Sequence, residues 1–379
     1  MRIGKFNFSH YINYIVIGLV TAILGGITLS GGKLDSSLLY LLEKMAISII
    51  LAVSLSLVVG FLGELSLGHA GFMCVGAYLG GKISALLVPM LGNGPLAFLI
   101  SLLVGAGAAA VCGVIIGLPA LRLRGDYLAI VTLAFGEIVK SLFMNSSSAS
   151  FGGSLGLQTP RYDKNYLFII AFGLVLLTLM VVQNLMRSKH GRAITAIRDN
   201  EIAARATGIN VTKYKLLAFT LSAAFAGVAG VLYSYSNYRV QSTTFGYNYS
   251  IDILVMVVLG GMGNINGSII SAALITFLDT KLATVLTGNL AVLQNLFYAL
   301  ILIVIVIYNN APMLKGIREK YNLGALWGKL YRRKVDPADI RDDKAKWDVI
   351  TTKINMDEIL SVDVMPQEIN DPEEQGGAK

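Results

Sequence analysis

The chain has 379 residues, of which 55% are hydrophobic and only 14% are charged. A soluble domain carries about 25% charged residues, so this composition, with a mean hydropathy of +0.66, excludes a soluble fold and predicts an all-α polytopic membrane protein. The net charge of +8 does not indicate nucleic acid, because the basic residues lie beside apolar segments, where they meet anionic membrane lipid. The two cysteines lie inside apolar segments, so we expect no metal site.

A membrane-spanning helix needs about 20 mostly apolar residues. The apolar runs predict about ten transmembrane helices, within a range of roughly 8–10. These predicted spans cover residues 11–29, 38–62, 66–88, 95–118, 126–145, 166–186, 214–238, 249–264, 267–286 and 290–308. The run at 249–264 is short, and we interpret it as a possible half-helix or re-entrant segment.

Lysine and arginine accumulate in loops that stay in the cytoplasm. The N-terminus carries Arg2 and Lys5, so we expect it to be cytoplasmic, and alternation over the spans then places the C-terminus there too. Residues 1–312 form the predicted transmembrane domain. Residues 313–379 form a predicted cytoplasmic tail, first basic and then acidic, whose composition is typical of disorder.

The segment 187–215 is a basic, polar loop between two apolar runs, so it is predicted to be cytoplasmic. Asn200 is a good helix N-cap, Glu201 and Arg205 suit the first and last turns, and Gly208 suits the position after the helix. We therefore predict a short helix with a face of Ile202, Ala203 and Ala206. Such a face suits insertion into a groove on another protein, although an ordinary basic loop remains an alternative.

Two glycine-rich segments, at 60–71 and 260–267, interrupt the apolar pattern. Broken helices often line transport pathways, but both segments also suit tight turns between adjacent spans at the cytoplasmic surface.

Ionisable side chains inside membrane spans are costly and are therefore candidates for function. Possible translocation-pathway residues are Glu64, His69, Glu137 and Asp279. For Glu64 a position at the membrane interface is expected, for His69 a structural hydrogen bond is favoured, and for Glu137 an i,i+3 pair with Lys140 is favoured. Asp279 lies near the middle of its run, and packing and pathway roles stay equally open.

Four runs occur in order: GELSLGHAGFMCVGAYLGG at 63–81, LPALRLRGDYLAIVTLAFGEIV at 118–139, the segment 191–230, and VLGGMGNINGSIISAALI at 258–275. Together they resemble the LivM-type permease subunits of branched-chain amino acid ABC importers. The resemblance implies that this chain translocates branched-chain amino acids across a bacterial or archaeal cell (inner) membrane. Related permeases carry urea, short amides or other amino acids, so these substrates stay open. A secondary transporter and a passive channel are less favoured classes.

The resemblance also implies partners. These are a second LivH-like permease, two ABC ATPase subunits that bind ATP and magnesium, and an extracytoplasmic substrate-binding protein. The predicted short helix then corresponds to the coupling helix that docks on an ATPase, with Ala203 and Ala204 expected against its groove. The residues assigned to it are Arg198, Asp199, Asn200, Glu201, Ile202, Ala203, Ala204, Gly208 and Ile209.

Small residues recur four apart at Gly76 and Gly80, Gly113 and Gly117, and Ala223 and Gly227. Such motifs let membrane helices approach closely. Their number suggests, together with the resemblance, that some of them face the second permease.

The chain is not expected to be an enzyme or to hold a cofactor of its own. A phosphate-binding P-loop needs G-x-x-x-x-G-K-[ST], and the nearest match, at Gly76 to Lys82, is followed by Ile83 inside an apolar run. The sequence also shows no catalytic triad and no paired catalytic carboxylates.

Overall fold

The computed structural model describes residues 12–29, 35–92, 94–121, 125–162 and 164–285, together with the single positions 123, 296, 299, 300 and 303. Within this part of the chain, seven helices are long and apolar enough to cross a membrane. The predicted helical, multi-pass membrane protein is therefore confirmed. The tenth predicted span, at 290–308, lies almost wholly outside the described residues, and the tail at 313–379 lies entirely outside them.

Each of the first nine predicted spans coincides with a helix. In chain order these are α1 (Ile12–Leu29), α2 (Ser36–Ser56), α3 (His69–Leu91), α4 (Pro95–Ala120), α5 (Asp126–Met144), α7 (Lys164–Arg187), α10 (Val211–Ser236), α11 (Tyr247–Gly260) and α12 (Ile265–Val285). With 14 residues, α11 is shorter than the about 20 that a full crossing needs. The interpretation of this segment as short is confirmed.

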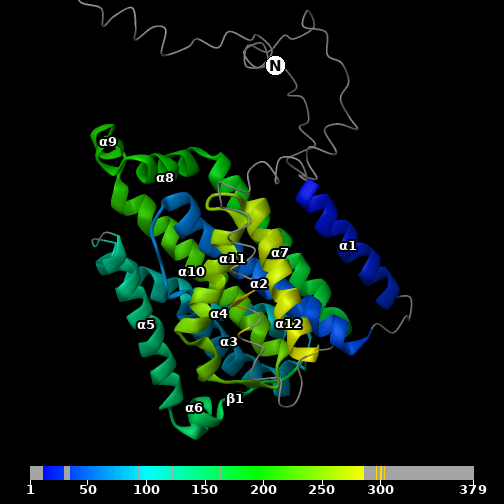
Figure 1. Cartoon of the computed structure of the whole chain (residues 1–379). Coiled ribbons are helices and arrows are strands. Elements are labelled where there is room, and N and C mark those ends of the chain that lie inside the picture. Colours follow the sequence, from blue (N-terminus) through cyan, green and yellow to red (C-terminus); the bar gives the residue numbers. More distant parts are fainter. Residues whose placement is uncertain are drawn as a thin grey trace, which may run out of the picture. The chain divides into compact units, whose positions relative to one another are not determined.

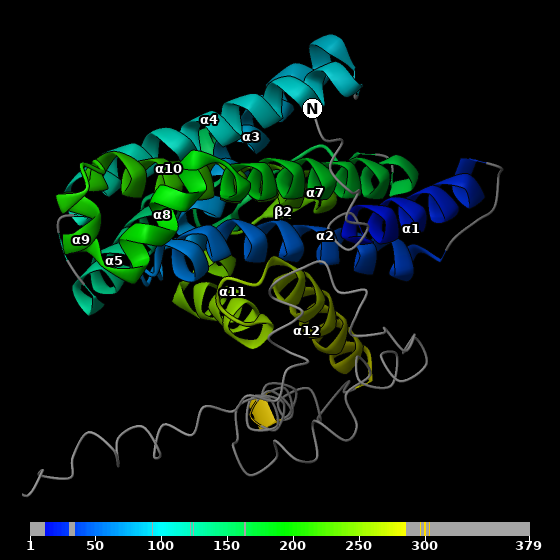
Figure 2. The ribbon, with the colours of Figure 1, turned by 90° about the horizontal axis from the view of Figure 1, so that it is seen from above.

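Helices α2 and α10 form the middle of the bundle (Figures 1 and 2). Helix α10 packs against α3 and α4 on one side and against α2 on the other, while α7 and α12 flank α2. In Figure 2, α3 and α4 lie on the opposite side of this middle layer from α11 and α12. Helix α1 packs against α7.

Small residues allow the close packing of α3, α4 and α10. A Cβ added at Gly76 would lie 2.4 Å from the carbonyl oxygen of Gly227, and one added at Gly113 would lie 2.7 Å from Cβ of Ala223. These motifs are therefore used inside the chain, where close backbone approach replaces hydrophobic exclusion as the source of helix association. The predicted use of these motifs for close helix packing is therefore confirmed at these positions.

Short elements close the end of the bundle that is lower in Figure 1. They are α6 (Ser148–Phe151), a 3₁₀ turn at Gly153–Leu155, strand β1 (Leu157–Gln158), strand β2 (Arg239–Val240) and a 3₁₀ turn at Ser242–Phe245. The two strands pair antiparallel, with Leu157 opposite Val240. Apart from this two-residue ladder, the described residues match the predicted all-α class.

The two glycine-rich segments pack against each other. Helix α2 continues into a π-helical turn at Leu57–Leu62, and Gly63 then adopts φ 78° before an extended stretch leads to α3. The second segment is a tight turn with Gly261 at φ 90° and Gly263 at φ 82°. A Cβ at Gly60 would lie 2.5 Å from the backbone nitrogen of Gly263, so only glycine permits this contact.

The basic loop at 187–215 contains two helices. After Arg187, Ser188 caps α8 (Lys189–Asp199), and Asn200 ends α8 and caps α9 (Glu201–Ala206). Only α9 was predicted from the sequence. Helix α8 forms because Ala193, Ile194 and Ile197 share one face and are buried, a pattern that the surrounding charges obscure.

Candidate functional site

The predicted short helix α9 is present with both of its caps. Oδ1 of Asn200 accepts hydrogen bonds from the backbone nitrogens of Ile202 and Ala203, each at 3.0 Å. At the other end, Gly208 has φ +85°. Its nitrogen donates to the Arg205 carbonyl and that of Ile209 donates to the Ala204 carbonyl, both at 3.1 Å. These two bonds form a Schellman motif, which satisfies carbonyls that the helix leaves open.

Helix α9 presents a small apolar face at the surface of the chain. Ile202 is 75% exposed, and Ala203 and Ala206 are exposed beside it, as predicted. Ala204 points the other way and is only 4% exposed, in a cluster with Leu57 of the π-helical turn. The expectation that Ala204 faces a partner is therefore wrong, because its side chain packs against the chain's own buried cluster.

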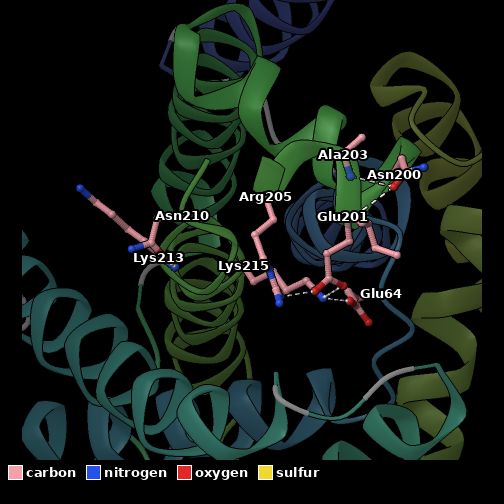
Figure 3. Close-up of polar contacts among 9 residues, drawn as sticks. Glu64, Asn200, Glu201, Ala203, Arg205, Asn210, Lys213 and Lys215 are labelled. Carbon is pink, nitrogen blue, oxygen red and sulfur yellow. Dashed lines mark hydrogen bonds and ion pairs between the residues drawn. The ribbon is translucent and has the colours of Figure 1, made fainter. Parts of the chain in front are cut away.

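An ion-pair cluster of Glu64, Glu201 and the buried Lys215 anchors α9 (Figure 3). Nζ of Lys215 lies 2.5 Å from Oε1 of Glu64 and 3.2 Å from Oε2 of Glu201. Lys215 is 3% exposed, so its charge is compensated by these two carboxylates rather than by water. The cluster joins the first turn of α9 to the extended segment that follows α2.

Arg198 makes a second connection to the same region. Its Nη1 donates to the carbonyl oxygen of Gly60 at 3.1 Å, and its other guanidinium nitrogens bind Oδ1 of Asp199. A π-helical turn leaves carbonyls without their usual i,i+4 partners, so Arg198 donates where the α-helical ladder of α2 is interrupted. The predicted coupling residues Arg198 and Glu201 are thus brought together with Glu64, which was predicted separately as a pathway candidate.

Glu137 of α5 has a positioning role in the structure. Its Oε2 accepts from Nζ of Lys140 at 2.8 Å, which confirms the predicted i,i+3 pair. Its Oε1 accepts from the backbone nitrogen of Tyr247 at 2.9 Å, the first residue of α11. Because Gly246 provides no side chain to cap α11, Glu137 supplies that acceptor from a different helix.

His69 is 2% exposed, and its Nε2 lies 2.8 Å from Oγ of Ser54 in α2. The structure therefore agrees with the structural hydrogen bond favoured for this residue. Its place at the first residue of α3 fixes the start of that helix against α2.

Asp279 lines a cavity with a volume of about 540 Å³. Its Oδ2 lies 2.9 Å from Nζ of Lys44 in α2, and Asp252 of α11 lines the same cavity. Both partners of the Lys44–Asp279 pair remain partly exposed, at 37% and 39%. The cavity is formed by α2, α10, α11 and α12, together with the segment that joins α10 to α11.

Three charged residues of these sites were missed or set aside in the sequence. They are Lys44, Asp252 and Lys215, and Lys215 lies at the end of the basic segment 187–215. Lys44 could have been found from the sequence, because it lies within the apolar run of α2. Ionisable side chains inside membrane spans are candidates for function, which is the reason that Asp279 was selected.

Residues 37–307 match the protein family described as "Branched-chain amino acid transport system / permease component". The chain is 37% identical over 298 residues to the high-affinity branched-chain amino acid transport system permease protein LivM of Salmonella typhimurium. It is 38% identical over 293 residues to the protein of the same name from Escherichia coli. Each of these two alignments covers 69% of this chain, which spans 66% of the length of each relative.

A more distant relative is the ribose import permease protein RbsC of Escherichia coli, 27% identical over 296 residues, which cover 73% of this chain and 86% of that protein. No solved structure gives a significant match to the chain.

Proposed function

Because the chain belongs to the family of branched-chain amino acid transport system permease components, we propose that it is the transmembrane permease subunit of an ATP-binding cassette importer for branched-chain amino acids. Membership confirms the resemblance that the four sequence runs indicate. The import itself is driven, in this proposal, by ATP that partner subunits bind with magnesium and hydrolyse.

The geometry of α9 carries the proposal. Helix α9 is capped at both ends, and it exposes Ile202 and Ala203. Its first turn is anchored through the buried Lys215. These features make it a rigid, shallow apolar knob. Such a knob fits a groove on a partner ATPase and transmits its movement into the bundle, because the anchor ties it to the end of α2. In this proposal the α8–α9 end of the bundle is cytoplasmic.

The substrate assignment rests on the relatives. The LivM proteins of two bacteria are 37% and 38% identical, whereas the ribose permease is 27% identical. None of these relatives favours urea or short amides. The proposed partners are a LivH-like second permease, two ABC ATPases and an extracytoplasmic binding protein, in a bacterial or archaeal inner membrane.

The test uses the chain expressed with these four partners and reconstituted in vesicles. The wild-type complex should accumulate leucine only when ATP reaches the α8–α9 side and loaded binding protein is present outside. The variant Ala203→Glu should insert normally, lose the ATPase subunits on purification and lose uptake, because an unpaired charge at an interface costs a few kcal/mol, about 3–5 for a buried one.

Two matched controls accompany this variant. Ala203→Ser keeps the face small and uncharged, and Thr212→Glu adds the same charge at an exposed position outside α9; both should copurify with the ATPases and transport normally. Normal docking and uptake by the Ala203→Glu protein would show that α9 is not the docking element.

A further inference from the structure

The cavity that contains Asp279 lies far from α9. Its lining from α10 begins at Tyr233, 18 residues after Lys215, which corresponds to about 27 Å along a helix. Its lining from α2 includes Lys44, near the start of that helix, whereas the contacts with Arg198 are at the opposite end. The cavity therefore belongs to the end of the bundle opposite the proposed docking surface, where an importer receives its substrate.

The cavity combines charges of both signs with apolar surface. One ammonium, Lys44, and two carboxylates, Asp252 and Asp279, line it, together with the side chains of Ile47, Met256 and Ile275. The volume of about 540 Å³ falls within the roughly 300–1,000 Å³ typical of small-molecule sites. A neutral sugar would not need this arrangement, because it would desolvate the charges without pairing them.

We propose that this cavity is a binding site for an α-amino acid in its zwitterionic form, with the α-carboxylate on Lys44 and the α-ammonium between Asp252 and Asp279. An apolar side chain then packs against Ile47, Met256 and Ile275. The proposal deepens the proposed function and rests on it, since it names the groups that recognise the imported substrate.

The Lys44–Asp279 pair can exchange its partners for the two charged groups of a substrate. In the cavity wall, Nζ of Lys44 lies 2.9 Å from Oδ2 of Asp279, so the two side chains neutralise each other. When a zwitterion enters, the Lys44 ammonium pairs with the substrate carboxylate, and Asp279 shares the substrate ammonium with Asp252, so neither Lys44 nor Asp279 is left without a counterion. The partners are 37% and 39% exposed, so water reaches them, and an ion pair of this kind contributes at most about 1 kcal/mol and is easily exchanged.

The first measurement is uptake by the complete reconstituted transporter. Lys44→Met and Asp252→Asn should each lower ATP-driven leucine uptake at least tenfold, while loaded binding protein still stimulates ATP hydrolysis. Lys281→Met and Asp35→Asn are the controls: they change charges at the same end of the bundle outside the cavity lining and should leave uptake unchanged. Wild-type uptake by both cavity variants would overturn the site while leaving the proposed function intact.

The second measurement detects ligand binding in the cavity while Lys44, Asp252 and Asp279 remain unchanged. Ile251 lines the cavity and is 40% exposed. An Ile251→Cys variant, with Cys74 and Cys112 replaced by alanine, is treated with a neutral maleimide in the complete transporter. Leucine should slow the modification, whereas leucinamide, isovalerate and sodium chloride should not.

Equal protection by leucinamide or isovalerate would show that the site does not read both charges, and protection by sodium ions alone would identify an ion site; either result overturns the proposal. If the wild-type transporter imports no leucine, the proposed function fails. The cavity is then judged by maleimide protection with leucine alone, and a lack of protection refutes it.

Discussion

Lys215 is the residue on which the contacts of the α9 end converge. Its ammonium joins Glu64, which is 151 positions away in the sequence, to Glu201, which is 14 positions away. Replacing both partners of a buried ion pair by apolar side chains often leaves the stability of a protein unchanged or raises it. Removing only one partner is strongly destabilising, because the other charge stays buried and unpaired. The cluster therefore suits a connection between α9 and the membrane helices that has to stay intact when α9 moves.

The variant Lys215→Met tests this connection. It leaves Glu64, whose side chain is 12% exposed, without its cation, while Glu201 keeps its pair with Arg205. We therefore expect a loss of about 3–5 kcal/mol of stability together with a loss of uptake. The double variant Lys215→Met with Glu64→Gln should recover a large part of the stability, because it also removes the carboxylate that has lost its cation.

The control is Arg205→Ala. Arg205 also pairs with Glu201, at 2.9 Å, but its side chain is 65% exposed, so its removal should cost under about 1 kcal/mol. Thermal unfolding of the purified chain measures all three variants. Equal losses for Lys215→Met and Arg205→Ala would contradict the importance given to burial.

At the scale of elements, α2 connects the two sites. Lys44 in its first half lines the cavity, and the π-helical turn at Leu57–Leu62 ends it beside Arg198 and α9. A π-helical turn inside a membrane helix is a place where the ladder of hydrogen bonds can shift by one residue, and such turns are frequent at functional sites. A movement of α9 thus has a direct mechanical connection to the helix that carries Lys44.

The packing of α3 on α10 gives a prediction with a close control. Gly76→Ala places a Cβ 2.4 Å from a backbone carbonyl of α10, and backbone cannot yield as a side chain can, so we expect about 1–3 kcal/mol of destabilisation or more. Gly107→Ala in α4 meets nothing within 4 Å and should be neutral or stabilising by up to about 1 kcal/mol. Thermal unfolding in detergent separates the two; a similar effect of both would mean that the contact is loose.

The cap of α9 gives a second prediction at this scale. Gly208 has φ +85°, and the space that a Cβ would occupy there is open, so a replacement meets only backbone strain. Gly208→Val should cost about 1–2 kcal/mol, tilt or unravel α9 and weaken copurification with the ATPases. Gly208→Asn, a residue that tolerates this conformation better, should retain most of the docking, and thermal unfolding of the membrane bundle should change little in either variant.

For the whole molecule, the orientation of the bundle in the membrane is the main consequence of the proposal. Helix α10, with 26 residues, is about 39 Å long and exceeds the roughly 30 Å hydrocarbon core, so its two ends lie on opposite sides of the membrane. In this proposal the basic residues of α8 and α9 place their end in the cytoplasm. Strands β1 and β2 and α6 then lie outside.

Cysteine labelling tests this orientation in a background without Cys74 and Cys112. Lys189→Cys, at an exposed position of α8, should react with a membrane-impermeant thiol reagent only after the cells are opened. Leu155→Cys, where the native side chain is 66% exposed, should react in intact cells. The reverse pattern would invert the bundle and remove α9 from the ATPase side.

The sequence alone determined the class of protein, the positions of nine apolar helices, seven of which are long and apolar enough to cross a membrane, and the caps of α9. These are local properties: a run of apolar residues has to be long enough to cross lipid, and Asn200 and Gly208 act on backbone groups within one turn of themselves. The sequence did not reveal α8, because Ala193, Ile194 and Ile197 form an apolar stripe too small to be noticed among the charges of that segment.

Only the tertiary structure decided which charges meet. Asp279 and Lys44 are 235 positions apart, and nothing in their spacing selects one pairing over another. The same holds for Ala204, whose burial depends on the cluster with Leu57, and for Gly76, which contacts Gly227 of the same chain. The physical reason is that the spacing of residues along a helix determines which of them share a face, whereas the packing of whole helices determines which other residues that face contacts.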